Sequence, residues 1–129
     1  MKFLHTSITV RNMDESIRFY TEVLGLSFER RRAIPENHAE IAFVLDPVSG
    51  ARLELTKWEG KDSFEPGEQL DHLAFEVPDL DSALAHARSK GARVAKEPFS
   101  LSGGSGRLAF LWDPNDVWVE LIEHRADRA

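Results

Sequence analysis

A stretch that reads His5-Thr-Ser-Ile-Thr-Val10-Arg-Asn-Met-Asp14 near the start of the chain returns 67 residues later as His72-Leu-Ala-Phe-Glu-Val77-Pro-Asp-Leu-Asp81. The same offset relates Ala42-Phe43-Val44-Leu45-Asp46-Pro47 to Ala109-Phe110-Leu111-Trp112-Asp113-Pro114, and an offset of 66 relates Leu53-Glu54-Leu55 to Val119-Glu120-Leu121. A turn between two strands tolerates a one-residue difference of this kind. The chain is therefore an internal duplication, in which each copy is one supersecondary unit.

Each copy reads as a strand, a helix and three more strands. Residues 5–10 alternate between polar and apolar side chains, which is the pattern of a half-buried strand. Asn12 followed by Glu15 predicts a capped helix that ends at Gly25, and Asp79 and Gly91 bound its counterpart. Short apolar runs then predict three strands in each copy: 26–28, 41–45 and 53–55, followed by 93–95, 108–112 and 117–122.

These elements predict an α+β fold made of two tandem βαβββ modules. We expect a single domain over residues 1–126, with repeat 1 over about 1–58, a linker over about 59–69 and repeat 2 over about 70–126. Within the first repeat, Leu26 and Phe28 are expected in the hydrophobic core.

The composition restricts the kinds of partner. The chain has 129 residues, of which 42% are hydrophobic, and this fits one globular domain. It has no cysteine, so disulfides and thiolate ligands are excluded. A net charge of -6 disfavours nucleic acid as a partner. Because no apolar run reaches the roughly 20 residues of a membrane span and no signal peptide is recognisable, we expect a cytoplasmic protein without a membrane partner.

The duplication also repeats a pair of possible metal ligands. Each copy has one His at the start of its first strand and one Glu within its last strand, namely His5 with Glu54 and His72 with Glu120. A single His on a strand is more often a structural residue, but its recurrence at equivalent positions of a duplicated fold favours a shared role. Imidazole nitrogen and carboxylate oxygen suit divalent Zn, Ni, Co, Fe or Mn. We therefore predict one metal site built from all four side chains.

The same segments carry a family resemblance. The stretches FLHTSITVRNMDESIRFYTEVLGLSF (3–28), LELT (53–56), DHLAFEV (71–77) and WDPNDVWVELIE (112–123) resemble bacterial glyoxalase I (lactoylglutathione lyase) of the vicinal oxygen chelate superfamily. The resemblance spans nearly the whole chain. It implies isomerisation of the hemithioacetal of a 2-oxoaldehyde, such as methylglyoxal, to a 2-hydroxyacyl thioester, with glutathione as co-substrate.

The resemblance also implies a cofactor, an assembly and residue roles. It implies one divalent metal per site, with Ni or Co favoured and Zn as an alternative. It implies a homodimer with barrel-like sites at its interface, where His5 and Glu54 of one subunit meet His72 and Glu120 of the other. Glu120 is then the leading catalytic base, with Glu54 as its partner.

This sequence departs from the family at the positions that bind glutathione. The matching positions of a first-strand Arg and of an Asn after the first Glu hold Thr9 and Trp58, or Lys57 under another gap placement. We assign substrate contacts to Thr9, Trp58 and Arg107, and the run of Arg30, Arg31 and Arg32 offers further replacements for the lost cations. A charged run on a strand is nevertheless more often a solvated edge. The glycine-rich loop 100–106, which lacks the lysine usual before it, is interpreted as a lid.

Two other kinds of function stay open at this point. One is a different metalloenzyme of the same superfamily, such as an epimerase, a dioxygenase or a thiol transferase. The other is a non-catalytic ligand-binding protein, for which four intact metal ligands would have no use.

Overall fold

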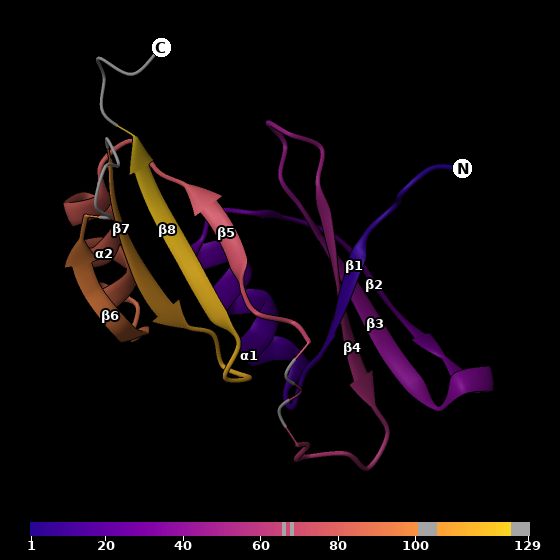
Figure 1. Cartoon of the computed structure of the whole chain (residues 1–129). Helices are drawn as coiled ribbons and strands as arrows, with labels where there is room; N and C mark the ends of the chain where they lie inside the picture. Colours follow the sequence, from indigo (N-terminus) through magenta and orange to yellow (C-terminus); the bar gives the residue numbers. More distant parts are fainter. Residues whose placement is uncertain (66, 68, 101–105, 125–129) are drawn as a thin grey trace. The chain divides into compact units, whose positions relative to one another are not determined.

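Both copies of the repeat fold as a four-stranded mixed sheet with one helix (Figure 1). The computed structural model describes residues 1–65, 67, 69–100 and 106–124. The chain divides into two compact units, Met1–Glu65 and Pro66–Ala129. The predicted order of strand, helix and three strands is confirmed in each of them.

Unit 1 has its four strands in the order β1-β4-β3-β2. β1 runs parallel to β4, and the other neighbours are antiparallel. The elements are β1 (Thr6–Thr9), α1 (Met13–Arg18), a π-helical turn (Phe19–Val23), β2 (Ser27–Ile34), a 3-10 turn (Pro35–Asn37), β3 (Ala39–Leu45) and β4 (Arg52–Trp58).

Unit 2 repeats this topology in the order β5-β8-β7-β6, again with one parallel pair, β5 with β8. Its elements are β5 (Leu73–Glu76), α2 (Leu80–Ser89), β6 (Arg93–Phe99), β7 (Gly106–Trp112) and β8 (Trp118–His124). The His of each copy lies directly before the first strand of its unit, and the Glu lies within the last strand.

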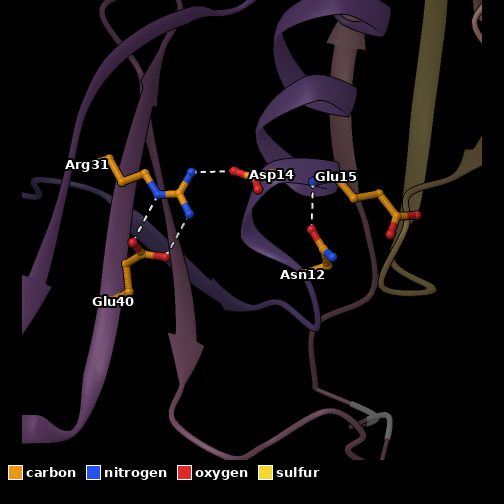
Figure 2. Close-up of polar contacts among 5 residues, drawn as sticks. All are labelled: Asn12, Asp14, Glu15, Arg31 and Glu40. Carbon is orange, nitrogen blue, oxygen red and sulfur yellow. Dashed lines mark hydrogen bonds and ion pairs between the residues drawn. The ribbon is translucent and has the colours of Figure 1, made fainter.

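The two helices begin at side-chain caps, as predicted. The Asn12 side chain accepts a hydrogen bond of 2.9 Å from the backbone N–H of Glu15 (Figure 2). Asp79 accepts one of 3.1 Å from the N–H of Ser82. Each cap satisfies a backbone donor that the first turn of a helix leaves without a partner. The helices are therefore positioned by their own local sequence, and each leads the chain away from the strand that follows the His.

The strand alternation gives each sheet a buried face toward its helix. In unit 1 this face carries Ile8, Val44 and Leu55, which are 5%, 0% and 0% exposed. In unit 2 it carries Val119 and Leu121, 0% and 2% exposed. Because successive side chains of a strand point to opposite faces, the intervening residues lie on the other face. That other face carries Glu54 in unit 1 and Glu120 in unit 2.

Strand β2 differs from the prediction. It continues to Ile34 and includes the arginine run, whereas the apolar pattern predicted only residues 26–28. Phe28 is 49% exposed, so its expected place in the core is wrong. β2 is one of the two edge strands of its sheet and pairs on one side only, and its side chains lie largely in solvent. Within the described part of the chain, no helix has the length and apolar character needed to span a membrane.

Candidate metal centre

The face of each sheet that does not carry its helix, here called the site face, brings the predicted ligands together in pairs. In unit 1, Ser7, Glu54 and Phe43 lie directly opposite one another on β1, β4 and β3. In unit 2, the corresponding row is Ala74, Glu120 and Phe110 on β5, β8 and β7. The two rows are equivalent positions of the repeat.

In unit 1, His5 approaches Glu54. The His5 Nε2 atom lies 3.7 Å from Glu54 Oε1. The imidazole ring stands edge-on to Phe43 with a centroid distance of 5.0 Å. On the other side, the Thr56 hydroxyl lies 3.5 Å from Glu54 Oε1 and 2.9 Å from the Ser7 hydroxyl. The carboxylate is thus held by neighbours on its own sheet with one side toward the imidazole.

In unit 2, His72 is closer to its carboxylate. Its Nε2 atom lies 3.2 Å from Glu120 Oε1, and its Nδ1 atom lies 2.7 Å from Asp71 Oδ1. The ring stands edge-on to Phe110 at a centroid distance of 5.8 Å. Phe110 in turn packs against Trp118 at 4.9 Å. His72 thus contacts both the Glu120 carboxylate and the ring of Phe110, which lies opposite Glu120 on β7.

The two carboxylates next to His72 change its protonation. A hydrogen bond with Asp71 raises the pKa of His72 above its ordinary value of 6.5, and the charge of Glu120 acts in the same direction. Any metal that binds Nε2 has to displace a proton from this imidazole at low pH.

The chemistry of both pairs fits a divalent metal. Two donors that each lie about 2.1 Å from one ion, at an angle between octahedral and tetrahedral, are separated by roughly 3.0–3.4 Å. The observed separations of 3.7 Å and 3.2 Å are close to that range. The side chains of His5 and Glu54 are 31% and 18% exposed, and those of His72 and Glu120 are 34% and 15% exposed, so an ion can reach them.

Each unit brings together one His–Glu pair and no larger cluster of possible metal ligands. No group of three or more His, Asp or Glu side chains that could hold a metal occurs among residues 1–65, 67, 69–100 and 106–124. The four ligands predicted from the sequence thus appear as two equivalent pairs, one in each unit.

The predicted substrate contacts divide between the two faces. Thr9 lies opposite Thr56 on the same face as Glu54, and Trp58, at the end of β4, shares that face and is 40% exposed. Arg107 does not: it lies on the helix side of β7, where its guanidinium is 3.1 Å from both Asp81 of α2 and Glu123. The loop 100–106, interpreted above as a lid, is outside the described residues except at its two ends, Ser100 and Gly106.

Two cations complete the rows on the site face. Arg30 of β2 lies opposite Phe43, and Lys96 of β6 lies opposite Phe110. Sequence reasoning missed Lys96, because the repeat offset of 67 matches Arg30 to Glu97, and only the strand register places Lys96 at the equivalent position. In both strands a register shift precedes the cation, between Phe28 and Arg30 and between Val94 and Lys96. Such bulges turn the next side chain to the other face of the sheet.

Comparisons with known proteins agree with this duplicated architecture. The lactoylglutathione lyase of Haemophilus influenzae is 35% identical over 131 residues, covering 100% of this chain and 97% of that protein. The lactoylglutathione lyase of Salmonella typhimurium is 37% identical over 125 residues, covering 95% and 93%.

Solved structures show the same fold. The trypanothione-dependent glyoxalase I of Leishmania major superposes with a TM-score of 0.80 at 33% identity, covering 95% of this chain and 86% of that one. The glyoxalase I of Zea mays superposes with a TM-score of 0.86 at 32% identity, covering 98% of this chain and 45% of that one. The family model for the glyoxalase/bleomycin resistance protein/dioxygenase superfamily matches residues 2–121, and this chain belongs to that superfamily.

Proposed function

We propose that this protein is a metal-dependent isomerase of the glyoxalase I type, which converts a 2-oxoaldehyde–thiol hemithioacetal into a 2-hydroxyacyl thioester. The observation that carries the proposal is the recurrence of one His–Glu pair at equivalent positions of both sheets. Relatives called lactoylglutathione lyase, about 35% identical over almost the full chain, support the same reaction. Glutathione is the proposed thiol.

The proposed metal ligands are the four side chains of the two pairs: His5, Glu54, His72 and Glu120. In this proposal the pairs meet around one divalent ion, with Ni or Co favoured over Zn, in a homodimer whose subunits each supply one pair to a shared site. The bound ion supplies Lewis acidity that polarises the oxygens of the substrate. The two imidazole nitrogens and two carboxylates would hold the ion, and this donor set suits a divalent transition metal.

Glu120 is the proposed base. The reaction moves one proton between neighbouring carbons and a second proton between the oxygens bound to them. The carboxylate that removes the first proton from the hemithioacetal carbon can return it to the adjacent carbon, so atoms and charge balance. Glu120 Oε1 lies 3.2 Å from Nε2 of His72, the Glu120 side chain is 15% exposed, and Phe110 lies opposite it on β7. Glu54 occupies the equivalent position and is the proposed partner carboxylate.

The decisive experiment is turnover of methylglyoxal with glutathione. The metal-free protein is reconstituted separately with Ni, Co, Zn, Mn and Fe(II), and thioester formation is followed by its ultraviolet absorbance. We expect activity with at least one metal and none after chelation. If the protein binds metal but shows turnover with none of the five ions, the proposal is contradicted.

A different reaction on the same scaffold is the second candidate. It is favoured by one observation: Thr9 and Trp58 lie on the site face at positions that match the glutathione-binding Arg and Asn of the resembling enzymes. Turnover with another thiol but not with glutathione would support this candidate and would retain the metal centre.

A further inference from the structure

The site face of unit 1 has a cation in the same cross-strand row as Glu54. Glu54 of β4 lies opposite Phe43 of β3, and Phe43 lies opposite Arg30 of β2. Neighbouring strands are about 4.8 Å apart, so the backbone of Arg30 is roughly 10 Å from that of Glu54. The side chain of Arg30 points along the same face, because its guanidinium carbon lies 4.7 Å from the centroid of the Phe43 ring.

The Phe43 ring connects this cation to the His5–Glu54 pair. One contact of the ring is Arg30, and another is His5 at a centroid distance of 5.0 Å. A guanidinium that stacks on an aromatic ring keeps its N–H donors at the edge of the plane free for a carboxylate. The aromatic ring thus holds Arg30 in place without neutralising its charge.

Three other arginines on the sheets are already engaged with acids. Arg31 donates to Glu40 at 3.0 Å and also to Asp14, on the helix side of the sheet (Figure 2). Arg52 pairs with Glu29 at 2.9 Å, and Arg107 pairs with Asp81 and Glu123. Within the described part of the chain, no ion pair shorter than 4.0 Å is found for Arg30. Among the described residues, Arg30 is the cation in the row of Glu54, whereas Arg32 of the same strand lies on the same face opposite Ile41, level with Thr56.

The bulge in β2 determines which face of the sheet carries the Arg30 side chain. Phe28 lies opposite Val44 on the helix side, and regular alternation would place Arg30 on that side too. The extra residue, Glu29, turns Arg30 to the site face instead. Unit 2 repeats the device, with Val94 on the helix side and Lys96 opposite Phe110. Bulges are frequent next to active sites, where they redirect a side chain.

We propose that Arg30 binds a carboxylate of the thiol part of the substrate and thereby selects an anionic thiol adduct. This inference rests on the proposed function. It places the charged end of the substrate over β3 and β2. Thr9, the position that matches the first-strand arginine of the resembling enzymes, lies on the opposite side of Glu54. Arg30 acts as a specificity residue and takes no part in proton transfer.

The test asks whether the effect of Arg30 on KM depends on a carboxylate of the substrate. KM and kcat are measured for the wild type and for Arg30→Gln, with methylglyoxal adducts of glutathione, its glycine monoethyl ester and its diethyl ester. Loss of a charge-assisted hydrogen bond is expected to raise KM for the glutathione adduct roughly 10- to 100-fold. Because ground-state binding is lost, kcat should change little. With the ester that lacks the bound carboxylate, wild type and variant should have the same KM.

The pattern of esters assigns the contact. If the KM values of variant and wild type are equal with the monoester, Arg30 binds the glycine carboxylate. If the KM values are equal only with the diester, Arg30 binds the glutamyl carboxylate. A KM for Arg30→Gln equal to that of the wild type with glutathione would overturn the inference, as would a defect that persists with the diester. Absence of turnover by the wild type would instead contradict the proposed function.

Two controls separate charge and folding from binding. Arg18→Gln removes the same charge from the exposed side of α1 and should leave KM unchanged. Calorimetric binding of S-methylglutathione, an unreactive thioether, gives a readout that does not need turnover. Should Arg30→Gln not fold, the wild type still decides: equal affinity for this thioether and for its diethyl ester would overturn the inference.

Discussion

The Nδ1 atom of His72 lies 2.7 Å from the carboxylate of Asp71, whereas its counterpart in the first unit, His5, follows Leu4. A carboxylate on Nδ1 fixes the tautomer of the ring and leaves the lone pair of Nε2 directed at a metal. Nε2 of His72 is also the imidazole nitrogen nearer to its glutamate, at 3.2 Å against 3.7 Å for His5. The second pair is therefore the better organised half of the proposed metal centre.

Removing this carboxylate should weaken metal binding. Asp71→Asn is expected to lower the affinity for Ni or Zn roughly 10- to 100-fold, because the imidazole loses its orienting partner. The affinity should be measured by competition with a chelator at a pH above the raised pKa of His72, so that the imidazole is neutral in both proteins. Asp62→Asn, which removes an exposed carboxylate outside the two pairs, is the matched control. Equal affinities of Asp71→Asn and the wild type would contradict this role.

The protonation of His72 gives a separate prediction for the metal-free protein. Asp71 and Glu120 favour the charged imidazole, so the pKa of His72 is raised above 6.5. In Asp71→Asn the pKa should fall toward that ordinary value. Since the metal requires the neutral ring, affinity in the wild type should rise as pH increases through the raised pKa. Titration of the His72 ring protons by NMR measures the shift, and an unchanged or higher pKa in the variant would refute its assigned cause.

Proton transfer by Glu120 can be separated from metal binding. Glu120→Gln keeps the size of the side chain and an oxygen donor but removes the base, so kcat should fall roughly 100- to 10,000-fold. Metal content, measured after reconstitution and dialysis, shows whether the site is still loaded. Full turnover by the loaded variant would assign the base to another residue, with Glu54→Gln as the next one to measure.

Substitution of Arg107 is predicted to affect stability and not substrate binding, unlike substitution of Arg30. The sequence alone made both residues candidates for substrate binding. Arg107 bonds to Asp81 and Glu123 on the helix side of β7, and Glu123 also accepts a hydrogen bond of 3.2 Å from the N–H of Leu80. Arg107→Gln should therefore lower the thermal unfolding temperature and leave KM unchanged. A raised KM with normal stability would return Arg107 to the substrate site.

Gly106 begins β7 where the backbone of β8 passes very close. A Cβ atom at this position would lie 2.2 Å from the carbonyl oxygen of Glu123, so the two strands would have to separate. Gly106→Ala is expected to reduce the free energy of unfolding by about 1–3 kcal/mol. At Gly67 a Cβ atom meets nothing within 4 Å, and Gly67→Ala should be neutral in the same denaturation experiment.

Several parts of the fold and of the site follow from the sequence because their signals are local. The offset between His5 and His72 revealed the duplication, and the caps at Asn12 and Asp79 placed the helices. Alternation on short strands put a His and a Glu at equivalent positions of each copy. Such patterns depend on neighbours a few residues away, and a duplication presents each pattern twice.

Tertiary structure alone decided which charged side chains face the pairs. Arg30, Arg31 and Arg32 are consecutive in sequence, yet a single bulged residue, Glu29, turns Arg30 toward Phe43 and leaves Arg31 to Asp14 and Glu40 on the helix side. The exposure of Phe28 has the same kind of origin, because an edge strand has a neighbour on one side only. Bulges and strand order result from pairing between distant segments, and no pattern within one segment records them.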